Sequence, residues 1–341
     1  MSMSTHMARE ATQAAAAVRA QLLHNDVLMR RIADFVRELA PHVVITCARG
    51  SSDHAATFAK YLIEAQTGTP TASAALSISS LYGAQPAMHR SLLLAISQSG
   101  RSPDLLAAVS SARAAGACVL ALCNSPQAPL NQLARFPIPL LAGTEASVAA
   151  TKSFIASLSA ILHLVAHWQA DRALLDAVQR LPDELERAWQ LDWRPAVAPL
   201  LKATNLFVVA RGYGLAIAQE AALKLKETCG LHAEAFSAAE VQHGPMALVR
   251  DGFPVLMLSQ SDATHASTLA LAHEFIARGA RVLLAGAWTE GAVLLPTLAS
   301  HPVSEPILMI QSFYRLANEL AIARGLNPDS PPHLRKVTET L

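Results

Sequence analysis

Three ionisable residues that could move protons stand close together in the sequence: Glu220, Lys224 and Glu227. On a helix, their spacing of four and three residues places the two carboxylates and the amine on one face. The surrounding residues are almost all Ala and Leu, which favours a largely buried helix over a solvated row of ion pairs. A carboxylate held against a lysine in apolar surroundings can serve as a general base. The segment therefore predicts proton-transfer chemistry.

Two more residues are candidates only in combination with this helix. His243 precedes Gly244 and Pro245 and follows a loop rich in small residues and carboxylates. A single histidine is more often structural than catalytic, although its imidazole can carry protons near neutral pH. Lys336 stands in an apolar-flanked segment near the end of the sequence, where most lysines are solvated.

Polar turns follow two apolar runs in the first half of the chain. One turn contains Gly50, Ser51 and Ser52, and the other runs from Ser97 to Ser102 with the sequence Ser-Gln-Ser-Gly-Arg-Ser. Each turn leads into a predicted helix, whose free N–H groups and partial positive charge stabilise an anion. Hydroxyl groups add donors, and glycine permits close approach. The turns predict a phosphate site, although ordinary helix capping by Ser and Asp is the simpler alternative.

The chain repeats itself. Ala-Arg-Gly occurs at 48–50 and again at 210–212, and Ser-Gln-Ser occurs at 97–99 and at 259–261, so both motifs recur 162 residues later. In each copy, apolar runs alternate with helical stretches, which is typical of parallel βαβ units. We therefore expect an α/β protein with two tandem doubly wound parallel sheets of the flavodoxin-like kind. Thr144-Glu145 and Ser304-Glu305 should each open a helix.

The predicted boundaries follow from this repeat. N-terminal helices occupy 1–40 with a break at Asn25-Asp26, and the first domain, which binds phosphate, occupies 41–170. A helical bridge over 171–202 is interrupted at Pro182 and Pro195. The second domain, at 203–325, carries the catalytic helix and loop, and a tail at 326–341 carries Lys336 and is not one regular helix.

The two copies differ at their polar turns. In the second copy Tyr213 replaces a hydroxyl residue and Asp262 replaces the glycine. A carboxylate at that position would repel phosphate. We therefore expect the anion in the first copy and the catalytic groups in the second, on a helix that begins at the ligand-binding end of its sheet.

Composition limits the class of function. The 341 residues are 52% apolar with a formal net charge of +1, and they contain no long run of like charge. That balance argues against a nucleic-acid-binding protein. The segment from Ser147 to Trp168 is apolar but contains Lys152 and His163, which predicts a buried helix rather than a membrane span. The four cysteines lack metal-ligand spacing, and we expect a cytoplasmic protein without a signal peptide.

These motifs together resemble the sugar isomerase (SIS) family, in particular the isomerase half of glucosamine-6-phosphate synthase. The resemblance runs from about Met7 to the end of the sequence. The motifs that carry it are Gly50-Ser51-Ser52, Ser97-Gln98-Ser99-Gly100, Gly143-Thr144-Glu145, Glu220 to Glu227, His243-Gly244-Pro245 and the segment from Pro331 to Lys336.

The resemblance implies a role for each candidate residue. The residues implied to hold the 6-phosphate of a sugar or to line its pocket are Ser51, Ser52, Ser97, Gln98, Ser99, Ser102, Val148, Glu220 and Lys224. Glu227 would move a proton between C1 and C2. His243 would assist ring opening from the neighbouring subunit of a homodimer, with sites at the subunit interface. Lys336 would meet the open-chain carbonyl carbon or its nitrogen, and the reaction would need neither cofactor nor metal.

Three departures from the synthase pattern influence the function that we expect for this protein. The sequence starts at the isomerase half, Arg101 stands where the synthase usually has an acid, and Ala150 stands where it has a serine. We expect a glucosamine-6-phosphate deaminase of the SIS type, which forms fructose 6-phosphate and ammonia. Open alternatives are a fructosamine-6-phosphate deglycase, another amino-sugar phosphate isomerase, the isomerase part of a glutamine–fructose-6-phosphate transaminase, and a sugar-phosphate-binding regulator.

Overall fold

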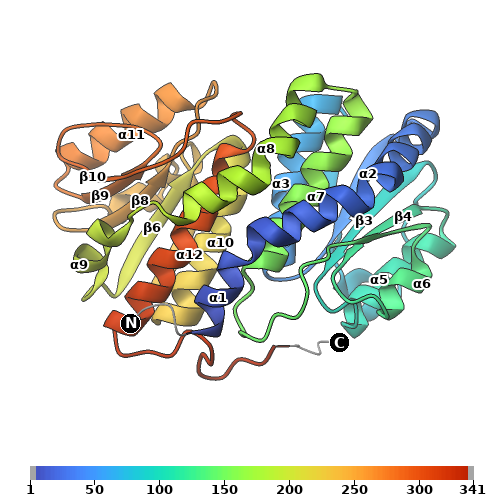
Figure 1. Cartoon of the computed structure of the whole chain (residues 1–341), viewed down its shortest axis with the longest axis horizontal. Coiled ribbons are helices and arrows are strands. Elements are labelled where there is room, and N and C mark those ends of the chain that lie inside the picture. Colours follow the sequence, from blue (N-terminus) through green and yellow to red (C-terminus); the bar gives the residue numbers. More distant parts are fainter. Residues whose placement is uncertain (1–4, 337–341) are drawn as a thin grey trace. The chain divides into compact units, whose positions relative to one another are not determined.

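The computed structural model describes residues 5–336, which form two compact units. Of the described residues, the first unit contains 16–145, 152–179 and 335–336. The second unit contains 5–15, 146–151 and 180–334. Each unit is built around one five-stranded parallel sheet with helices on both faces (Figure 1).

The sheet of the first unit has the strand order β2-β1-β3-β4-β5. This is the flavodoxin-like order, in which the chain leaves β1 in opposite directions to reach β2 and β3. Its strands are β1 (Val43–Cys47), β2 (Thr71–Ser73), β3 (Ser91–Ser97), β4 (Cys118–Cys123) and β5 (Phe136–Pro139). Its helices are α2 (Ala14–Leu39), α3 (Ser51–Thr67), α4 (Ser77–Ser80), α5 (Pro103–Ala114), α6 (Pro129–Leu133) and α7 (Lys152–Gln169).

The sheet of the second unit has the order β10-β9-β8-β6-β7, which is the same topology in its own numbering. Its strands are β6 (Asn205–Ala210), β7 (His232–Ser237), β8 (Pro254–Leu258), β9 (Arg281–Ala285) and β10 (Val293–Leu295). Its helices are α1 (His6–Thr12), α9 (Val197–Leu200), α10 (Leu215–Cys229), α11 (His265–Ala277) and α12 (Glu305–Ala323), and α8 (Arg172–Trp189) runs from the first unit into it. The two flavodoxin-like sheets expected from the repeat are confirmed.

Apolar residues at alternate strand positions build each core. In the first unit, Leu93 and Ala95 of β3 pack with Leu105 and Val109 of α5. In the second, the core consists of Val255 and Met257 of β8 with Leu271 and Phe275 of α11, among others. Successive strand residues face opposite sides of the sheet, and both sides are buried. These strands are therefore apolar at consecutive positions, instead of alternating between apolar and polar residues. Within residues 5–336, every helix is too short or too polar to span a bilayer.

Two expected helix breaks are wrong. The N-terminal helices separate at Gln13, not at Asn25-Asp26. Asn25 is fully buried inside α2, and its side-chain amide donates to the carbonyl of Pro139 over 2.9 Å, so a tertiary hydrogen bond outweighs its low helix propensity. Pro182 lies within α8 without ending it. The buried Val178, Leu181 and Leu185 on that helix offset the hydrogen bond that proline removes.

One of the two expected helix starts is also wrong. Ser304-Glu305 does open α12, whereas Thr144-Glu145 belongs to an irregular segment, and α7 begins only at Lys152. The Glu145 carboxylate accepts hydrogen bonds from the backbone N–H of Ser153 (3.3 Å) and from its hydroxyl (2.7 Å). Glu145 therefore stabilises the start of α7 from outside the helix. The burial expected for the segment from Ser147 to Trp168 is confirmed, because nearly all of α7 is buried.

Candidate functional site

The two polar turns of the first unit lie side by side at the carboxyl edge of its sheet. Strands β1 and β3 pair in parallel, with Cys47 opposite Ala95, so the turn after each strand emerges at the same edge. Gly50 and Gly100 have φ values of 56° and 61°, which side-chain-bearing residues adopt only with strain. This edge is the switch point of the sheet, where ligands bind in proteins of this topology.

Hydrogen bonds within the second turn fix its shape. The Ser97 hydroxyl accepts from the N–H of Gly100 over 2.9 Å, and the Ser99 hydroxyl accepts from the N–H of Arg101 over 3.4 Å. Ser102 is the N-cap of α5 but makes no side-chain capping bond, and Gly50 caps α3 without a side chain. Simple helix capping therefore does not explain Ser102. Ser51, Ser52 and Gln98 are half-buried at the same edge.

An ion pair joins the two turns. Arg49 donates from Nε and Nη2 to one oxygen of Asp104, over 3.0 and 2.9 Å. The Asp104 side chain is fully buried, and that of Arg49 is 57% exposed. Arg49 follows β1 and Asp104 stands in the first turn of α5, so the pair holds the two loops in one arrangement. The sequence analysis missed this pair, although the repeated Ala-Arg-Gly motif was a signal for it.

Tight packing requires glycine at position 100. A Cβ atom there would lie 2.6 Å from the Cβ of Ala128 and 2.8 Å from the Sγ of Cys123. Burial raises the pKa of the Cys123 thiol, which therefore stays protonated and acts as a packing group. The turn lies directly against the core.

The matching edge of the second unit is filled by its own side chains. The Gln260 amide nitrogen donates to the carbonyl of Arg211 (2.7 Å) and to Asp262 and Thr264 (3.1 Å each). The N–H and hydroxyl of Ser261 donate to the Glu305 carboxylate over 2.6 and 2.8 Å. These donors are therefore engaged by carboxylates of the unit itself. The expectation that an anion binds to the first copy rather than the second remains a prediction, and this arrangement supports it.

The predicted proton-transfer residues form one cluster on α10. Lys224 Nζ lies 3.3 Å from a Glu220 oxygen and 2.5 Å from a Glu227 oxygen, and the Tyr314 hydroxyl of α12 donates to Glu220 over 3.2 Å. The side chains of Glu220 and Lys224 are 0% and 1% exposed, whereas that of Glu227 is 19% exposed. The expected burial is confirmed, and Tyr314 is a member that the sequence analysis missed.

Electrostatics keep the lysine of this cluster charged. Burial alone would lower the pKa of Lys224, but the two neighbouring carboxylates outweigh it and raise that pKa above its usual value. Lys224 is therefore an ammonium group that balances the carboxylates and not itself a base. Glu227 is the cluster's partly exposed carboxylate.

Glu227 does not lie at the ligand-binding end of its sheet, where its helix begins. Helix α10 begins after β6 at the carboxyl edge and returns toward the amino edge, and Glu227 lies in its last turn. Twelve residues of helix place it about 18 Å from the start of α10. The rule that ligands bind at carboxyl edges therefore does not locate this residue. A carboxylate is also disfavoured at the negative end of a helix dipole, and Lys224 compensates for that cost.

Lys336 is anchored in the first unit. Its Nζ lies 3.0 Å from a Glu145 oxygen, with side-chain exposures of 24% for the lysine and 0% for the glutamate. The same carboxylate receives the two bonds from Ser153, so its position is fixed and it fixes Nζ in turn. The Gly-Thr-Glu motif marked Glu145 in the sequence, but not as the partner of Lys336.

The remaining candidates lie in the second unit. His243 is exposed and follows a short 3₁₀ turn at Glu240–Gln242. Val148 is half-buried in the irregular segment before α7, and its N–H contacts the carbonyl of Asp329 at 3.5 Å. Neither residue belongs to the α10 cluster.

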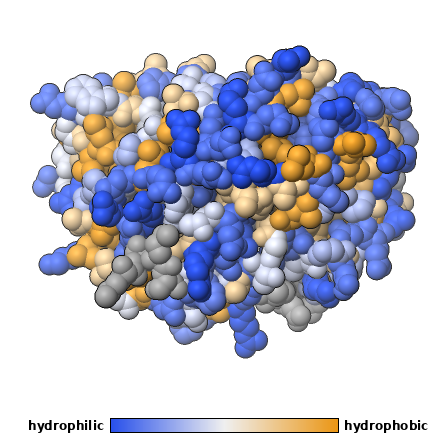
Figure 2. All heavy atoms as spheres, viewed as in Figure 1, coloured by the Kyte–Doolittle hydropathy of each residue, from blue (hydrophilic) through white to orange (hydrophobic). Residues whose placement is uncertain are grey.

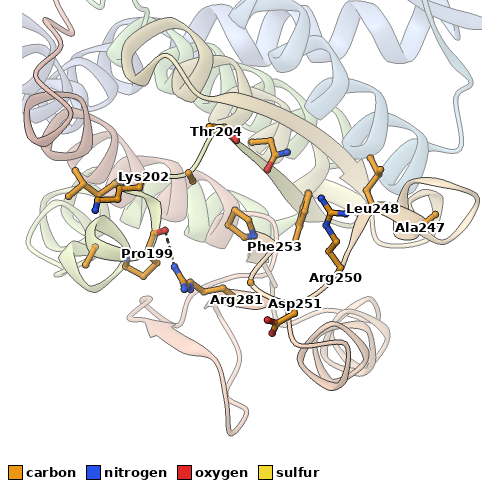
Figure 3. A pocket seen from close by; sticks show the side chains of 15 residues that line it. Pro199, Lys202, Thr204, Ala247, Leu248, Arg250, Asp251, Phe253 and Arg281 are labelled. Carbon is orange, nitrogen blue, oxygen red and sulfur yellow. Dashed lines mark hydrogen bonds between the residues drawn. The ribbon is translucent and has the colours of Figure 1, made fainter.

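A cleft of about 620 Å³ in the second unit lies away from its carboxyl edge. Figure 3 shows Lys202, Arg250, Phe253 and Arg281 around it, with Arg281 donating to the carbonyl of Pro199 over 3.4 Å. The cleft also contains Asn205, Pro254 and Arg281, which begin β6, β8 and β9. It is therefore at the amino edge of the sheet and is separate from both polar turns.

Two flavodoxin-like sheets in tandem, one with open polar turns at its switch point and one with those turns filled, define a duplicated α/β protein. The chain belongs to the SIS domain family, whose model matches residues 40–167 and 199–285.

The chain is also similar in sequence to curated proteins of known name. The chain is 32% identical over 339 residues to a glutamine–fructose-6-phosphate aminotransferase (isomerizing) of Methanothermobacter thermautotrophicus, covering 97% of this chain and 56% of that protein. The chain thus spans about half the length of the curated relatives it matches.

Solved structures of similar proteins agree with this family assignment. A proposed phosphosugar isomerase from Silicibacter pomeroyi is 40% identical, with a TM-score of 0.92 over 95% of this chain and 100% of that one. The C-terminal domain of a glucosamine–fructose-6-phosphate aminotransferase from Francisella tularensis is 25% identical, with a TM-score of 0.85 over 96% of this chain and 98% of that one.

Proposed function

We propose that this protein is a phosphosugar aldose–ketose isomerase, and specifically a deaminase that converts glucosamine 6-phosphate to fructose 6-phosphate and ammonia. The names of its relatives support the substrate class, because they include a proposed phosphosugar isomerase and enzymes that isomerise while transferring an amino group to fructose 6-phosphate. The observation that carries the proposal is the partly exposed carboxylate of Glu227 at the end of an otherwise buried acid–lysine cluster.

The chemistry that this cluster fits is transfer of one proton between adjacent carbons. In the proposed reaction, Glu227 takes the proton from C2 of the open-chain aldehyde, the aldehyde oxygen gains a proton from water, and an enolamine forms. Return of a proton to C1 gives an imine at C2, and water hydrolyses that imine to the ketone and ammonia. Lys224 holds Glu227 in position through the 2.5 Å contact, and the buried Glu220 and Tyr314 position Lys224.

The polar turns of the first unit are proposed to bind the 6-phosphate. Ser52, Ser97, Gln98, Ser99 and Ser102 stand at or beside the first turns of α3 and α5, whose N–H groups favour an anion. The exposed part of Arg49 adds a cation at the same edge. Ser51, also in the first turn of α3, would supply a further polar contact.

Lys336 and His243 are assigned to the reacting end of the sugar. Glu145 fixes the Lys336 amine, which would meet the open-chain carbonyl carbon or its nitrogen. His243 would assist ring opening. Val148, Glu220 and Lys224 would line the same pocket. These assignments rest on the family resemblance together with the partial exposure of Lys336 and the exposure of His243.

A homodimer with shared sites is part of the proposal. His243 is exposed, and its side chain makes no hydrogen bond to the α10 cluster, as expected of a group that serves a neighbouring subunit. Apolar side chains also lie among hydrophilic ones over the part of the surface where α2 runs (Figure 2). Leu23 and Val27 of α2 are 81% and 69% exposed.

Complementation between two inactive variants tests this sharing. His243→Ala protein mixed with Glu227→Gln protein under subunit exchange should recover about a quarter of native activity, since half of the dimers are mixed and each has one intact site. Mass spectrometry of the mixture verifies the exchange. No recovery after verified exchange would place both residues of each site in one subunit.

A second candidate function has specific support. Similarity to the aminotransferases favours the opposite direction, in which fructose 6-phosphate and ammonia form glucosamine 6-phosphate as the isomerase part of a transaminase reaction. Other amino leaving groups, as in a fructosamine-6-phosphate deglycase, would use the same site. A sugar-phosphate-binding regulator would need only the polar turns.

One assay separates these functions. Ammonia release and ketose formation are measured over a panel of glucosamine 6-phosphate, other amino-sugar 6-phosphates and fructosamine 6-phosphates, and the reverse reaction is run with fructose 6-phosphate and ammonium. The deaminase proposal expects the fastest release from glucosamine 6-phosphate. Faster turnover of a fructosamine phosphate would identify a deglycase, and binding without turnover of any substrate would identify a regulator.

A further inference from the structure

Two histidines and an aspartate meet between α2 and α7, away from the polar turns. His163 Nε2 lies 3.1 Å from His167 Nε2 and 3.6 Å from Asp26 Oδ1, and His167 Nε2 lies 3.3 Å from the same oxygen. The histidines stand four residues apart on one face of α7, and all three residues belong to the first unit. None of them has a role in the proposed reaction.

These separations fit the coordination shell of a small metal ion. In a tetrahedral site with metal–ligand bonds of about 2.0–2.1 Å, neighbouring ligand atoms lie about 3.3 Å apart. The three observed separations of 3.1, 3.3 and 3.6 Å scatter around that value. One ion could therefore bind all three atoms with little movement of the side chains.

Burial disfavours the charged form of both imidazoles. Burial, followed by the neighbouring His167, lowers the pKa of His163 to about 4, and burial likewise lowers the pKa of His167. Asp26 acts in the opposite direction on both rings but does not overcome burial. Arg30 and Arg37 add positive charge nearby and also lower the pKa of His167.

The two nitrogen atoms of the fully buried His163 ring have different surroundings. Nδ1 has no hydrogen-bond partner within the described residues, whereas Nε2 faces His167 and Asp26. Nε2 is therefore the atom through which His163 would bind an ion.

The cluster is open to solvent on one side and supported on the other. The side chain of Asp26 is 30% exposed and that of His167 is 12% exposed, so an ion and a water ligand can enter there. Arg30 binds the second oxygen, Oδ2, of Asp26 over 2.7 Å and leaves Oδ1 to the imidazoles. Arg37 binds the carbonyl oxygens of His167 and Trp168, which fixes the end of α7.

We propose that Asp26, His163 and His167 form a binding site for a divalent transition metal of the zinc type, with water as the fourth ligand. Two imidazoles and a carboxylate are a donor set that suits Zn²⁺ and its spectroscopic substitute Co²⁺. The ion would join α2 to α7 and would be structural, separate from the proposed sugar chemistry.

Metal titration of the full-length protein tests this proposal. Chelator-treated protein is titrated with ZnCl₂ by calorimetry and with CoCl₂ by absorption spectroscopy. We expect one ion per chain, intense d–d bands of tetrahedral Co²⁺, and a zinc-dependent rise in melting temperature. Absence of binding, or a Co²⁺ spectrum with only the weak bands of an octahedral ion, would overturn the proposal.

Variants of the two partly exposed residues of the cluster, here called rim variants, test whether zinc binds at this site. Asp26→Asn and His167→Gln lie at the exposed side of the cluster and should weaken zinc binding at least ~10-fold while keeping the native circular dichroism spectrum. His24→Gln is the matched control, because His24 is an exposed histidine on the same helix. Equal affinity in the native protein and both rim variants, or loss of binding in His24→Gln alone, would show that zinc binds elsewhere.

Discussion

The turn after β3 and the turn after β8 share the sequence Ser-Gln-Ser, the same topology and the same place on their sheets, but their donors differ in what they contact. In the second unit, Ser261 donates twice to Glu305. In the first unit, the corresponding glutamate in the repeat is Glu145, which binds Ser153 and Lys336 instead. Glu305 thus engages the donors of Ser261 in the second unit, whereas the corresponding Glu145 of the first unit binds Ser153 and Lys336.

This difference shows how a duplicated unit can divide its work. The copy with open turns keeps glycine at position 100, whereas the filled copy carries Asp262 there and retains a buried acid–lysine cluster on α10. Under the proposed division, substitutions in the first copy should change substrate binding, and substitutions in the second should change turnover.

The largest expected effect is on turnover. Glu227→Gln keeps the shape of the side chain but removes the proposed base, so kcat should fall at least ~10²-fold, while binding of a 6-phosphorylated substrate analogue should barely change. Steady-state kinetics and calorimetry measure the two quantities. Glu220→Gln is the matched control and should cost less, because Glu220 is fully buried behind Lys224. A larger loss in Glu220→Gln than in Glu227→Gln would assign the base to Glu220.

The opposite pattern is expected at the open turns. Ser99→Ala and Ser52→Ala should each weaken binding of a sugar 6-phosphate about ten- to a hundredfold, since a hydrogen bond to a charged group contributes roughly 1.5–3 kcal/mol. Titration with an unreactive 6-phosphate measures this change. Ser261→Ala is the control in the other copy. If it weakens binding as much as Ser99→Ala does, the phosphate does not belong to the first copy.

Stability, rather than ligand binding or turnover, should distinguish two glycines of the first unit. Gly100→Ala combines a left-handed φ with close contacts to Ala128 and Cys123, so it should cost roughly 2–5 kcal/mol. Gly50→Ala has a similar φ but no atom within 4 Å of the new Cβ, so it should cost only about 1–2 kcal/mol. Urea denaturation compares the two variants. Equal losses would mean that the turn after β3 relaxes away from the core.

The smallest effect on ligand binding is expected in the filled turn. Ser261→Ala removes one hydrogen bond to the buried Glu305 carboxylate and should destabilise the protein by about 1.5–3 kcal/mol. Its denaturation midpoint should therefore fall while sugar-phosphate affinity is kept. Loss of affinity without loss of stability would contradict the structural role given to this turn.

The sequence predicted features that repeat or have a local period. Both sheets, their common topology and the burial of Glu220 and Lys224 follow from apolar periodicity and from the 162-residue repeat. The presence of Asp262 in place of glycine was enough to predict that the two turns differ. Apolar periodicity and the Asp262 substitution act within a few residues, and the repeat shows that the same local pattern occurs twice.

Contacts between distant residues could not be predicted in the same way. Arg49 meets Asp104 across 55 residues, and Tyr314 meets Glu220 across 94. The start of α7 depends on Glu145 binding Ser153, and a local propensity for helix at Thr144 does not reveal that contact. Helix α10 runs from the carboxyl edge of the sheet toward the amino edge, so Glu227 in its last turn lies far from the carboxyl edge. The rule that ligands bind at carboxyl edges takes no account of this direction.

The ion pair between Glu145 and Lys336 also has a consequence for biosynthesis. The two residues are separated by 191 positions, and the intervening chain contains the whole sheet of the second unit. During translation, the first sheet can form as soon as its strands leave the ribosome, since domains generally fold in the order of their synthesis. Lys336, the partner of Glu145, is synthesised only after the second sheet. Under the proposed assignment of the phosphate to the first unit, an incomplete nascent chain would bind a sugar phosphate before it could turn one over.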